Sequence, residues 1–533
     1  MIRELGVNEV AEDLHSDVCI IGGGAAGITL ASRLADESDA SIVVLEAGTA
    51  SYSTESQQEY RSEHRPEFFP DPQFSRLRML GGSSNHWENS IERLRPIDFE
   101  IREWLPESGW PITYSDLVRY YSPAERLCGI RNSDYTFEAW AADDEEDFFG
   151  ASESFESVVA KSPLRPTRFS ELATSIARDS DRVNILLDAA LTTVDFDRES
   201  NSVLRVHALS SRGTSAKVTS KAFVIATGGI ENARILLALN ELYDDRLGNQ
   251  GGSVGRYFME HPTVRAAHYL PFDDERENLD EIYVGKTVGE QRIHARAALR
   301  ESAQRELLAS SMRMFFSPKS ALELSTGIAS SHVLSDSVAE REVPDNVGWH
   351  LSRILGDIPE IAEQALEKNQ IDFEWMNYVR EFEGYQVTAM MEQYPNRENK
   401  IILGEKTAAN QFPLPRINYS VSSIERENTW KVLEKLGADS GLIKRGRLRV
   451  LKQYSNRIWG NQIGYGQHHM GTTRMALDPN KGVVDQDLRV FGTDNLFVAG
   501  SSVFPTGGHV PPTLTIVALA LRLADHLNAE WFA

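Results

Sequence analysis

The sequence predicts an α/β protein in which a Rossmann-like, nucleotide-binding domain is assembled from separated segments, with a second, α+β domain inserted between them. A β-branched run at Asp17–Ile21 meets glycines and then an Ala- and Leu-rich helical pattern, which indicates a strand, a tight turn and a helix. Apolar runs that end in glycine recur at Ala222–Gly229 and Asn495–Ser501. The long stretches between these segments mix helical and strand patterns, which favours an inserted domain.

The remaining elements follow in chain order. A second β run at Ser41–Leu45 stands at the distance expected for a right-handed βαβ unit, so we expect it beside the first strand in a parallel sheet. We expect further strands at Val183–Leu187, Leu191–Phe196, Val203–Leu209, Gln386–Glu392 and Ile401–Leu403, and helices at Glu231–Leu239, Ile358–Lys368 and Thr513–Asn528. The nucleotide-binding domain would comprise residues 1–95, 183–260 and 450–533, and the inserted domain residues 96–182 and 261–449.

The length and composition exclude several classes of protein. With 533 residues, 41% of them hydrophobic and 25% charged, the chain has the composition of a globular protein of about three domains, or two large ones. The 55 basic and 78 acidic residues give a net charge of −23. Because this charge repels polyanions, we expect no nucleic acid partner.

Export and membrane insertion are not expected either. Cys19 and Cys128 are too few for a disulfide framework, and Met1–Ala11 has neither the basic nor the apolar region of a signal peptide. The longest apolar stretch, Leu514–Leu527, is interrupted by charged residues and is shorter than the ~20 residues that span a bilayer. We therefore expect a cytoplasmic protein without a membrane partner.

The glycine-rich turn has the spacing of a dinucleotide-binding fingerprint, Gly22-x-Gly24-x-x-Gly27, with Ala25 and Ala26 opening the helix. The first glycine permits the turn, the second lets the backbone approach a pyrophosphate, and the third lets the helix pack against the strand. The helix N-terminus then faces the phosphates, where its dipole favours negative charge.

Two further features indicate which dinucleotide is bound. Glu46 ends the second strand, where a carboxylate can accept hydrogen bonds from ribose hydroxyls, which disfavours NADP but does not separate FAD from NAD. Nicotinamide dehydrogenases usually have one contiguous dinucleotide domain, whereas glycine-bearing strand ends recur here at Thr227–Gly229 and Ala499–Ser501. A long flavin dinucleotide contacted by three segments fits this pattern, so we expect FAD as the cofactor.

Four further segments of the chain carry recognisable motifs: Arg78–Trp87, Ala226–Leu237, Gly255–Pro262 and Gln467–Met475. Together with the fingerprint and the C-terminal helix, they resemble the glucose–methanol–choline (GMC) family of FAD-dependent alcohol oxidoreductases. Within that family the chain looks most similar to the bacterial sugar and glycoside branch, which includes pyranose 2-oxidase. The resemblance implies the GMC fold, an FAD domain with an inserted substrate domain.

The resemblance also implies a mechanism, in which a base removes the hydroxyl proton of an alcohol while the carbinol carbon transfers a hydride to flavin N5. His468 matches the family's catalytic histidine, three residues before Gly471, and an imidazole titrates near neutrality, as a general base requires. We interpret the adjacent His469 as structural.

The sequence departs from the family at the second catalytic position. The family's usual His or Asn falls here on Pro511, which has no side-chain donor or acceptor. His509, two residues upstream in a glycine-bearing loop, is a candidate replacement. The alternatives are that one histidine suffices, or that the enzyme no longer performs ordinary alcohol oxidation.

The implied flavin contacts include the run Gly81–His86, which would wrap the ring edge with backbone amides. Asn85 is either a polar neighbour of the ring or a turn residue. His86 stands where pyranose 2-oxidase carries a histidine bonded to the flavin, but non-covalent relatives with similar runs favour a non-covalent cofactor. The implied cofactor-binding set is Gly22, Gly24, Ala25, Ala26, Gly27, Glu46, Gly81, Gly82, Ser83, Asn85, His86, Thr227, Gly228, Gly500, Ser501, Pro511 and Thr513.

The inserted domain would face the substrate side of the flavin. Trp87, Glu392 and Gln393 are the candidate substrate contacts, the last two because sugar-active relatives carry a similar run. Such residues suit a ligand rich in hydroxyl groups. The acidic net charge favours neutral or cationic sugars, such as amino sugars, over phosphorylated ones. Nothing in the pattern indicates a metal site.

We therefore expect FAD-dependent oxidation of a secondary hydroxyl of a sugar, glycoside or cyclitol to a ketone, with O₂ or another electron acceptor. One alternative, prompted by Pro511, is an atypical or redox-neutral flavoenzyme of a natural-product pathway. The other is a non-catalytic flavin-binding relative, against which the retained His468 argues. Neither the acceptor nor the oligomeric state follows from the sequence.

Overall fold

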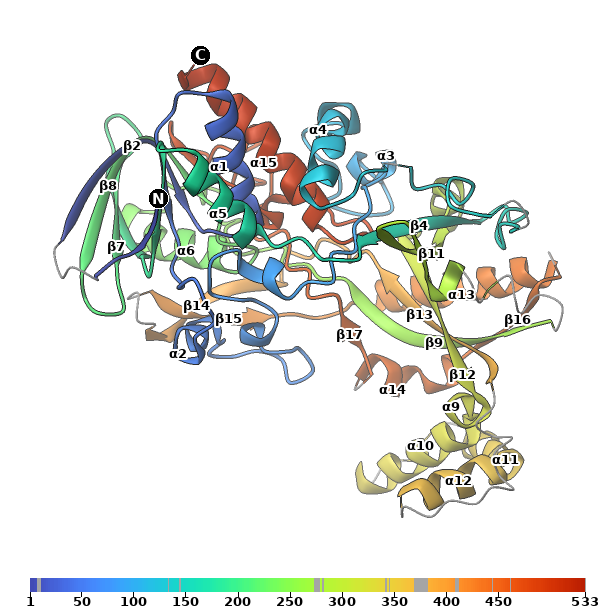
Figure 1. The fold of residues 1–533 in the computed structure, drawn as a ribbon. Coiled ribbons are helices and arrows are strands. Elements are labelled where there is room, and N and C mark those ends of the chain that lie inside the picture. The colour runs from blue at the N-terminus through green and yellow to red at the C-terminus, as the bar shows by residue number, and fades with distance from the viewer. Residues whose placement is uncertain are drawn as a thin grey trace.

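The computed structural model of the protein describes residues 1–6, 11–132, 134–142, 145–272, 279, 282–340, 343–344, 346–368, 382–407, 412–442, 444–460 and 462–532. Within these residues the chain forms two eight-stranded sheets and one two-stranded sheet. The two large sheets occupy opposite halves of the molecule, and the loops between them meet near its centre (Figure 1).

The first large sheet has the order β1-β5-β3-β2-β8-β7-β6, with β18 also paired to β8. The strands β1, β5, β3, β2, β8 and β18 run parallel, whereas β6 and β7 form an antiparallel extension. The strands are β1 (Ile2–Glu4), β2 (Glu12–Ile21), β3 (Ile42–Leu45), β5 (Val183–Leu187), β6 (Ala190–Asp197), β7 (Ser202–Leu209), β8 (Ser215–Ile225) and β18 (Leu496–Val498).

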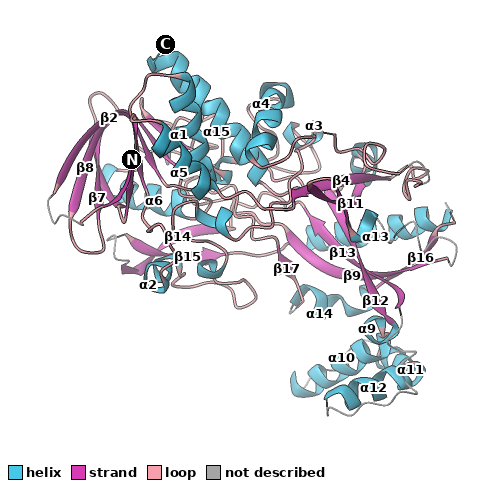
Figure 2. Ribbon diagram, in the orientation of Figure 1, coloured by secondary structure: helices cyan, strands magenta, loops and turns pink. Residues whose placement is uncertain are grey.

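Helices cover this sheet because its parallel strands are apolar on both faces, as at the buried run Val18–Ile21. The helix α1 (Ala25–Glu37) packs against both α15 (Thr513–Leu527) and α5 (Phe169–Asp179). These three helices lie together on the upper side of the sheet in Figure 2. The helix α6 (Glu231–Tyr243) contacts β6 and the small sheet of β14 (Lys400–Thr407) and β15 (Pro413–Asn418).

The second large sheet has the order β10-β11-β12-β13-β9-β16, with β4 paired to β11 and β17 to β9. All of its pairings are antiparallel. The strands are β4 (Phe155–Pro163), β9 (Pro262–Pro271), β10 (Lys286–Val288), β11 (Gln291–Leu299), β12 (Met312–Ser320), β13 (Phe382–Met391), β16 (Gly446–Val450) and β17 (Gly464–Tyr465).

The remaining helices are peripheral or connect the two halves. A helical group formed by α9, α10, α11 and α12 projects away from the second sheet at the lower right of Figure 1. The helices that the preceding paragraphs did not describe are α2 (Thr54–Gln57), α3 (Pro96–Phe99), α4 (Tyr114–Leu127), α8 (Glu301–Leu307), α9 (Ala321–Leu324), α10 (Thr326–Glu340), α11 (Val347–Gly356), α12 (Ile358–Lys368), α13 (Ser423–Leu442) and α14 (Ser455–Gly460). Among the described residues, no helix combines the length and apolarity needed to cross a bilayer.

The predicted bounds of the FAD-binding and inserted domains differ from the membership of the two large sheets at two places. The predicted inserted segment 96–182 is divided, because β4 joins the second sheet while α4 packs against α15 and α5 against α1. The predicted boundary at 450 falls too early, since β17 still pairs with β9 of the second sheet. Sequence patterns could not show these contacts because each joins segments that are distant in the chain.

Candidate active site

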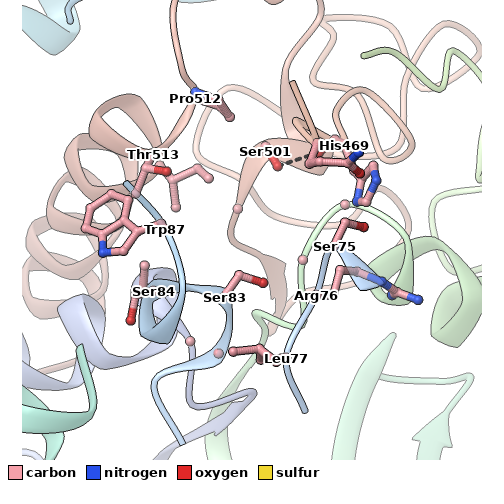
Figure 3. A pocket seen from close by; sticks show the side chains of 18 of the residues that line it. Ser75, Arg76, Leu77, Ser83, Ser84, Trp87, His469, Ser501, Pro512 and Thr513 are labelled. Carbon is pink, nitrogen blue, oxygen red and sulfur yellow. Dashed lines mark hydrogen bonds between the residues drawn. The ribbon is translucent and has the colours of Figure 1, made fainter. Parts of the chain in front are cut away.

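A cavity of about 1160 Å³ lies where the two halves of the molecule meet. One part of its wall consists of the segments that follow the carboxyl ends of four parallel strands, at Gly22, Gly24–Ala26, Glu46, Thr227–Gly229 and Gly500–Ser501. The opposite part comes from β11, β12 and β13 of the second sheet. Ligands of open parallel sheets bind at this edge, so the cavity occupies the expected place for a dinucleotide. Figure 3 shows a close view of it.

The glycines of the fingerprint meet the geometric demands of a pyrophosphate site. Gly22 has a φ of +113°, and a Cβ atom there would come within 2.4 Å of the carbonyl oxygen of Ala226. A Cβ atom on Gly27 would lie 2.0 Å from the carbonyl oxygen of Gly22, so Gly27 lets α1 pack closely on the turn. Gly24 faces open space within the cavity, at the N-terminus of α1. The backbone can therefore approach a phosphate group there.

Glu46 is held in a position suited to a ribose. Its two carboxylate oxygens accept hydrogen bonds from the backbone N–H of Gly23 at 2.8 Å and of Gly48 at 2.7 Å. The side chain is buried and lines the cavity. Because each carboxylate oxygen has a second lone pair, Glu46 retains acceptor capacity for ribose hydroxyls.

Asn232 joins the other two glycine-bearing segments. Its Oδ1 accepts from the backbone N–H and the hydroxyl of Thr227, both at 2.7 Å, while its Nδ2 donates to the carbonyl oxygen of Ala499 and to Ser502. One fully buried amide thus fixes the ends of β8 and β18 relative to each other. The three-segment arrangement expected for FAD is therefore present in the structure.

The loop before Trp87 presents Gly82, Ser83 and His86 to the cavity. Asn85 does not line it, because its Nδ2 donates to the carbonyl oxygens of Leu80 and Gly82 and its Oδ1 accepts from Ser170. The interpretation of Asn85 as a polar neighbour of the ring is thus corrected: its amide braces the loop.

The other residues of the predicted cofactor-binding set fall into two groups, those that lie behind the cavity and those that line it. Gly27 and Gly81 allow close backbone packing behind the cavity. The cavity itself is lined by Gly22, Gly24, Ala25, Ala26, Glu46, Thr227, Gly228, Gly500, Ser501, Pro511 and Thr513. The turn, the carboxylate and the converging backbone segments fit an FAD molecule.

His468 and His261 form a histidine pair beside the cavity. Met259 and Met470 pair in an antiparallel bridge, and the same register places His261 opposite His468. Their Nδ1 atoms lie 2.8 Å apart. His468 lines the cavity, whereas His261 is fully buried behind it.

The contacts of His261 determine which nitrogen of His468 carries a proton. The Nε2 atom of His261 lies 2.9 Å from the carbonyl oxygen of Gly508, which can only accept, so this Nε2 bears the hydrogen. Burial and the charge of Arg313 lower the pKa of His261 to about 3, so the ring is neutral and its Nδ1 is an acceptor. His468 must then donate from Nδ1. Its Nε2 remains unprotonated, because burial and the neighbouring His261 lower the pKa of His468 well below the usual value.

Glu260 holds the loop that carries His468. Its carboxylate accepts a hydrogen bond from the backbone N–H of His261 at 3.0 Å, and the backbone N–H groups of Gln467 and His468 also favour its ionised form. The group is fully buried, which raises its pKa to about 7. Its Oε1 also approaches Nε2 of His469 to 3.4 Å, without the alignment of a hydrogen bond. His469 packs against the ring of Phe258, and Ser501 donates to its backbone oxygen (Figure 3).

The structure does not support His509 as the second catalytic residue. His509 is fully buried and does not line the cavity. Its Nε2 lies 3.2 Å from Glu92 and its Nδ1 lies 3.4 Å from Arg95. The glycine-bearing loop turns this side chain into the protein, so the expectation that it reaches the substrate is corrected. The histidine beside His468 is His261.

Glu392 and Gln393 are corrected in the same way. Glu392 forms a bidentate ion pair with Arg102, at 2.7 and 2.6 Å, in which both side chains are 0% exposed. Gln393 is buried and bonds to the backbone of Glu260 and Ser420. Neither lines the cavity. Of the three predicted substrate contacts, Trp87 alone lines it, and its Nε1 donates to the carbonyl oxygen of Thr167.

Sequence reasoning missed the role of His261, although it lies in the motif Gly255–Pro262. The signal was the presence of two histidine-bearing motifs, but their pairing became visible only through the bridge between Met259 and Met470. The described residues contain no group of three or more side chains that could hold a metal ion.

Comparisons with protein families agree with this architecture. Residues 395–520 match the GMC oxidoreductase C-terminal family, and residues 20–80 match the NAD(P)-binding Rossmann-like domain.

Known proteins of similar sequence and structure point the same way. The chain is 23% identical to the 6'''-hydroxyparomomycin C oxidase of Streptomyces lividus, over 98% of this chain and 94% of that protein. It is 46% identical over 69 residues to the C-glycoside 3-oxidase of Microbacterium trichothecenolyticum, a match that covers 13% of each chain. The crystal structure of pyridoxine 4-oxidase from Mesorbium loti covers 96% of this chain and 99% of its own, at 17% identity and a TM-score of 0.56. Residues 395–520 thus match the C-terminal domain of the GMC oxidoreductases, and the protein is an FAD-dependent oxidoreductase that acts on hydroxyl groups.

Proposed function

We propose that the protein oxidises a secondary hydroxyl of a sugar, glycoside or cyclitol to a ketone, with His468 as the general base. The observation that carries the proposal is the unprotonated Nε2 that the contact with His261 leaves on a residue of the cavity wall. The relatives named as a 6'''-hydroxyparomomycin C oxidase and a C-glycoside 3-oxidase support this substrate class.

Oxidation of an alcohol to a ketone removes one proton and one hydride. Bound FAD supplies the hydride acceptor, and O₂ or another oxidant takes up the electrons afterwards. The chain supplies the proton acceptor: Nε2 of His468 takes the hydroxyl proton, while Nδ1 of His468 keeps donating to His261. A neutral imidazole is ready for this transfer without first losing a proton.

Pro511 needs no replacement in this scheme. It lines the cavity beside the N-terminus of α15 but offers no polar group. His261 fixes the ring of His468 from behind, so we infer that a single catalytic histidine suffices. Trp87 contributes an aromatic surface on the cavity wall, suited to packing against a sugar ring.

We further propose that FAD is bound without a covalent link. His86 lines the cavity, so it is the residue through which a covalent link would form. Acid precipitation of the holoenzyme checks the proposal: the yellow colour should remain in the supernatant, whereas a coloured pellet would reveal a tether through His86.

The test of the function is anaerobic mixing of the holoenzyme with a panel of sugars, glycosides and cyclitols. At least one of them should bleach the visible flavin band, and the product should carry a ketone at a ring carbon. His468→Ala should slow this reduction by roughly 10²- to 10⁴-fold, the usual contribution of a general base.

His509→Gln is a matched control, because it changes a buried histidine that lies outside the cavity. It should leave the rate of flavin reduction close to that of the unmodified enzyme. If no alcohol bleaches the flavin, a non-catalytic flavin-binding protein becomes the better description. If His468→Ala reacts at the normal rate, the assignment of the base is wrong.

A further inference from the structure

The cavity wall that belongs to the second sheet is cationic. Arg292, His294 and Arg296 alternate along β11, so their side chains project from the same face of the sheet, and all three line the cavity. Arg313 and Phe315 of the neighbouring strand β12 line it as well. The proposed base belongs to the same cavity, so this wall faces the space available to a substrate.

The two inner arginines differ in their partners. Arg313 is neutralised by Glu92, whose Oε2 lies 3.0 Å from its Nη1. Arg296 forms no ion pair with any carboxylate among the residues that the structure describes. Its Nη1 donates to the carbonyl oxygens of Ala295 at 2.9 Å and Tyr283 at 3.4 Å, and its other nitrogens make no hydrogen bond to described residues.

Arg296 is nevertheless held in place and charged. Its guanidinium lies over the ring of Phe315, 4.5 Å from the ring centre. Burial and the charge of Arg313 lower the pKa of Arg296 to about 9, so it remains a cation at neutral pH. Charged side chains that leave water are normally paired, because burial of an isolated charge is strongly unfavourable. An unpaired cation in a cavity wall therefore favours an anionic ligand.

The acidic groups nearby do not remove this preference. Glu92 is shared between Arg313 and His509. Glu88 lines the same cavity, but it is exposed and forms no ion pair with Arg296. Arg292 is exposed at the same wall and adds a second positive charge that can attract an anion from solution. The local charge is thus opposite in sign to the net charge of −23.

We propose that the substrate is a glycoside that carries a carboxylate, and that Arg296 binds this carboxylate while the reacting hydroxyl lies against His468. The assignment rests on the proposed function, whose substrate class it narrows. The planar fork of an arginine pairs with both oxygens of a carboxylate, which orients the ligand as well as attracting it. A single unpaired arginine matches a single negative charge better than a phosphate monoester, which the acidic surface also repels more strongly.

This inference revises the expectation of an amino sugar drawn from the overall charge. The net charge acts at long range and is screened by salt, whereas a cation in the cavity wall acts on the bound ligand itself. An ammonium group beside Arg296 would be repelled. The charge of the site therefore favours an anionic substrate, whereas the net charge of the chain favours a cationic one. We expect the charge of the site to determine which substrate binds.

The test compares matched sugar pairs on the holoenzyme: methyl β-D-glucoside with methyl β-D-glucuronide, and the corresponding galactoside with the galacturonide. Calorimetric binding in oxygen-free buffer measures the affinities, and anaerobic flavin bleaching measures the second-order rate constant of flavin reduction. We expect the uronides to bind at least tenfold more tightly, with a preference that falls as salt is added. Glucose 6-phosphate and methyl glucosaminide should bind more weakly than the uronide.

Variants test which residue causes the preference for uronides over neutral glycosides. Arg296→Gln should abolish the tenfold ratio of uronide to neutral glycoside, and Arg296→Lys, which keeps the charge without the fork, should retain part of it. Glu88→Gln should raise the ratio. Arg265→Gln is the matched control: Arg265 is an exposed arginine of β9 that lines a separate cavity, so its loss should leave the ratio unchanged.

Each outcome decides the proposal. Equal or weaker binding of the uronides, tighter binding of the phosphate or amino sugar, or a ratio that survives Arg296→Gln would overturn it. Binding that follows the predicted ratio without any flavin bleaching would support the carboxylate site and contradict the proposed oxidation. Flavin bleaching by neutral glycosides alone would support the proposed oxidation and contradict the carboxylate site.

Discussion

The Nδ1 atoms of His261 and His468 lie 2.8 Å apart, and this contact determines which ring nitrogen of His468 can act as a base. The hydrogen-bond sequence begins at the carbonyl oxygen of Gly508, which accepts from Nε2 of His261. Its direction follows from chemistry alone, since a carbonyl cannot donate and a neutral imidazole donates once and accepts once. The base is thus prepared by a residue that does not line the cavity.

His261→Ala should therefore slow flavin reduction while leaving substrate affinity nearly unchanged. Without the acceptor at Nδ1, the ring of His468 is free to carry its hydrogen on either nitrogen and to rotate. We expect the rate constant of flavin reduction to fall on the order of 10- to 100-fold, a fraction of the full contribution of a base. Stopped-flow reduction measures the rate, and the substrate concentration at half-saturation measures the affinity.

His261→Gln is the informative companion, because its amide oxygen can still accept a hydrogen bond from His468. It should recover part of the rate lost in His261→Ala. If both variants react at the normal rate, the tautomer of His468 does not depend on His261.

The pH dependence of the reaction should report Glu260. Its pKa is raised to about 7 by burial, so the carboxyl is largely protonated at pH 6 and ionised at pH 8. The ionised form accepts more strongly from the backbone N–H of His261 and stabilises the positive charge that develops on His468. Flavin reduction should therefore accelerate as the pH rises through about 7.

Glu260→Gln checks this assignment, since an amide does not titrate. The variant should react slowly at all pH values and lose the step near neutrality. His261 cannot produce that step, because its pKa of about 3 leaves it neutral throughout the range. A step that persists in Glu260→Gln would have to be assigned to another group, such as the substrate.

The sequence allowed prediction of the features that depend on local spacing. The turn at Gly22, the carboxylate of Glu46 and the strand Val183–Leu187 follow from periodicity and from the conformations that glycine permits, and the structure contains all three. His468 lines the cavity, and its role as the base stays a prediction drawn from its motif.

The incorrect expectations concern residues whose environment depends on tertiary pairing. Glu392 looked like a substrate contact, but its partner Arg102 lies 290 residues away in the chain. His509 was expected in the cavity, and the loop turns it towards Glu92 instead. A single sequence contains no period or spacing that relates such distant positions, so their burial could not be predicted.

Gly466 should tolerate no side chain. A Cβ atom there would lie 2.6 Å from Nδ1 of His468, closer than any van der Waals contact allows. In Gly466→Ala the imidazole must move away from His261, so we expect a fall in the rate of flavin reduction similar to that of His261→Ala.

The fold should be unaffected in this variant, because Gly466 lies in a partly exposed loop segment. Gly460→Ala is a matched control at an exposed glycine where a Cβ atom meets open space. Normal kinetics in Gly466→Ala would show that the ring of His468 can shift without losing its function.

The ion pair of Arg102 and Glu392 should couple stability to catalysis. Burial alone would raise the pKa of Glu392, but the charge and hydrogen bonds of Arg102 hold it below the usual value, so the carboxylate is ionised. Glu392 also accepts from the backbone N–H of Gly508 at 3.2 Å, and the carbonyl of that residue orients His261. The buried pair thus supports the loop that prepares the base.

Arg102→Met leaves a buried carboxylate without its partner and should lower the free energy of unfolding by about 3–5 kcal/mol, as measured by urea denaturation of the holoenzyme. Because Gly508 then loses its fixed position, flavin reduction should slow as well.

The double variant Arg102→Met, Glu392→Gln removes the unpaired charge and should recover part of the stability. The amide oxygen introduced by Glu392→Gln can still accept from the backbone N–H of Gly508, so part of the rate should return too. Recovery of stability without any recovery of the rate would separate the ion pair from the histidine pair and show that Gly508 is positioned by other contacts.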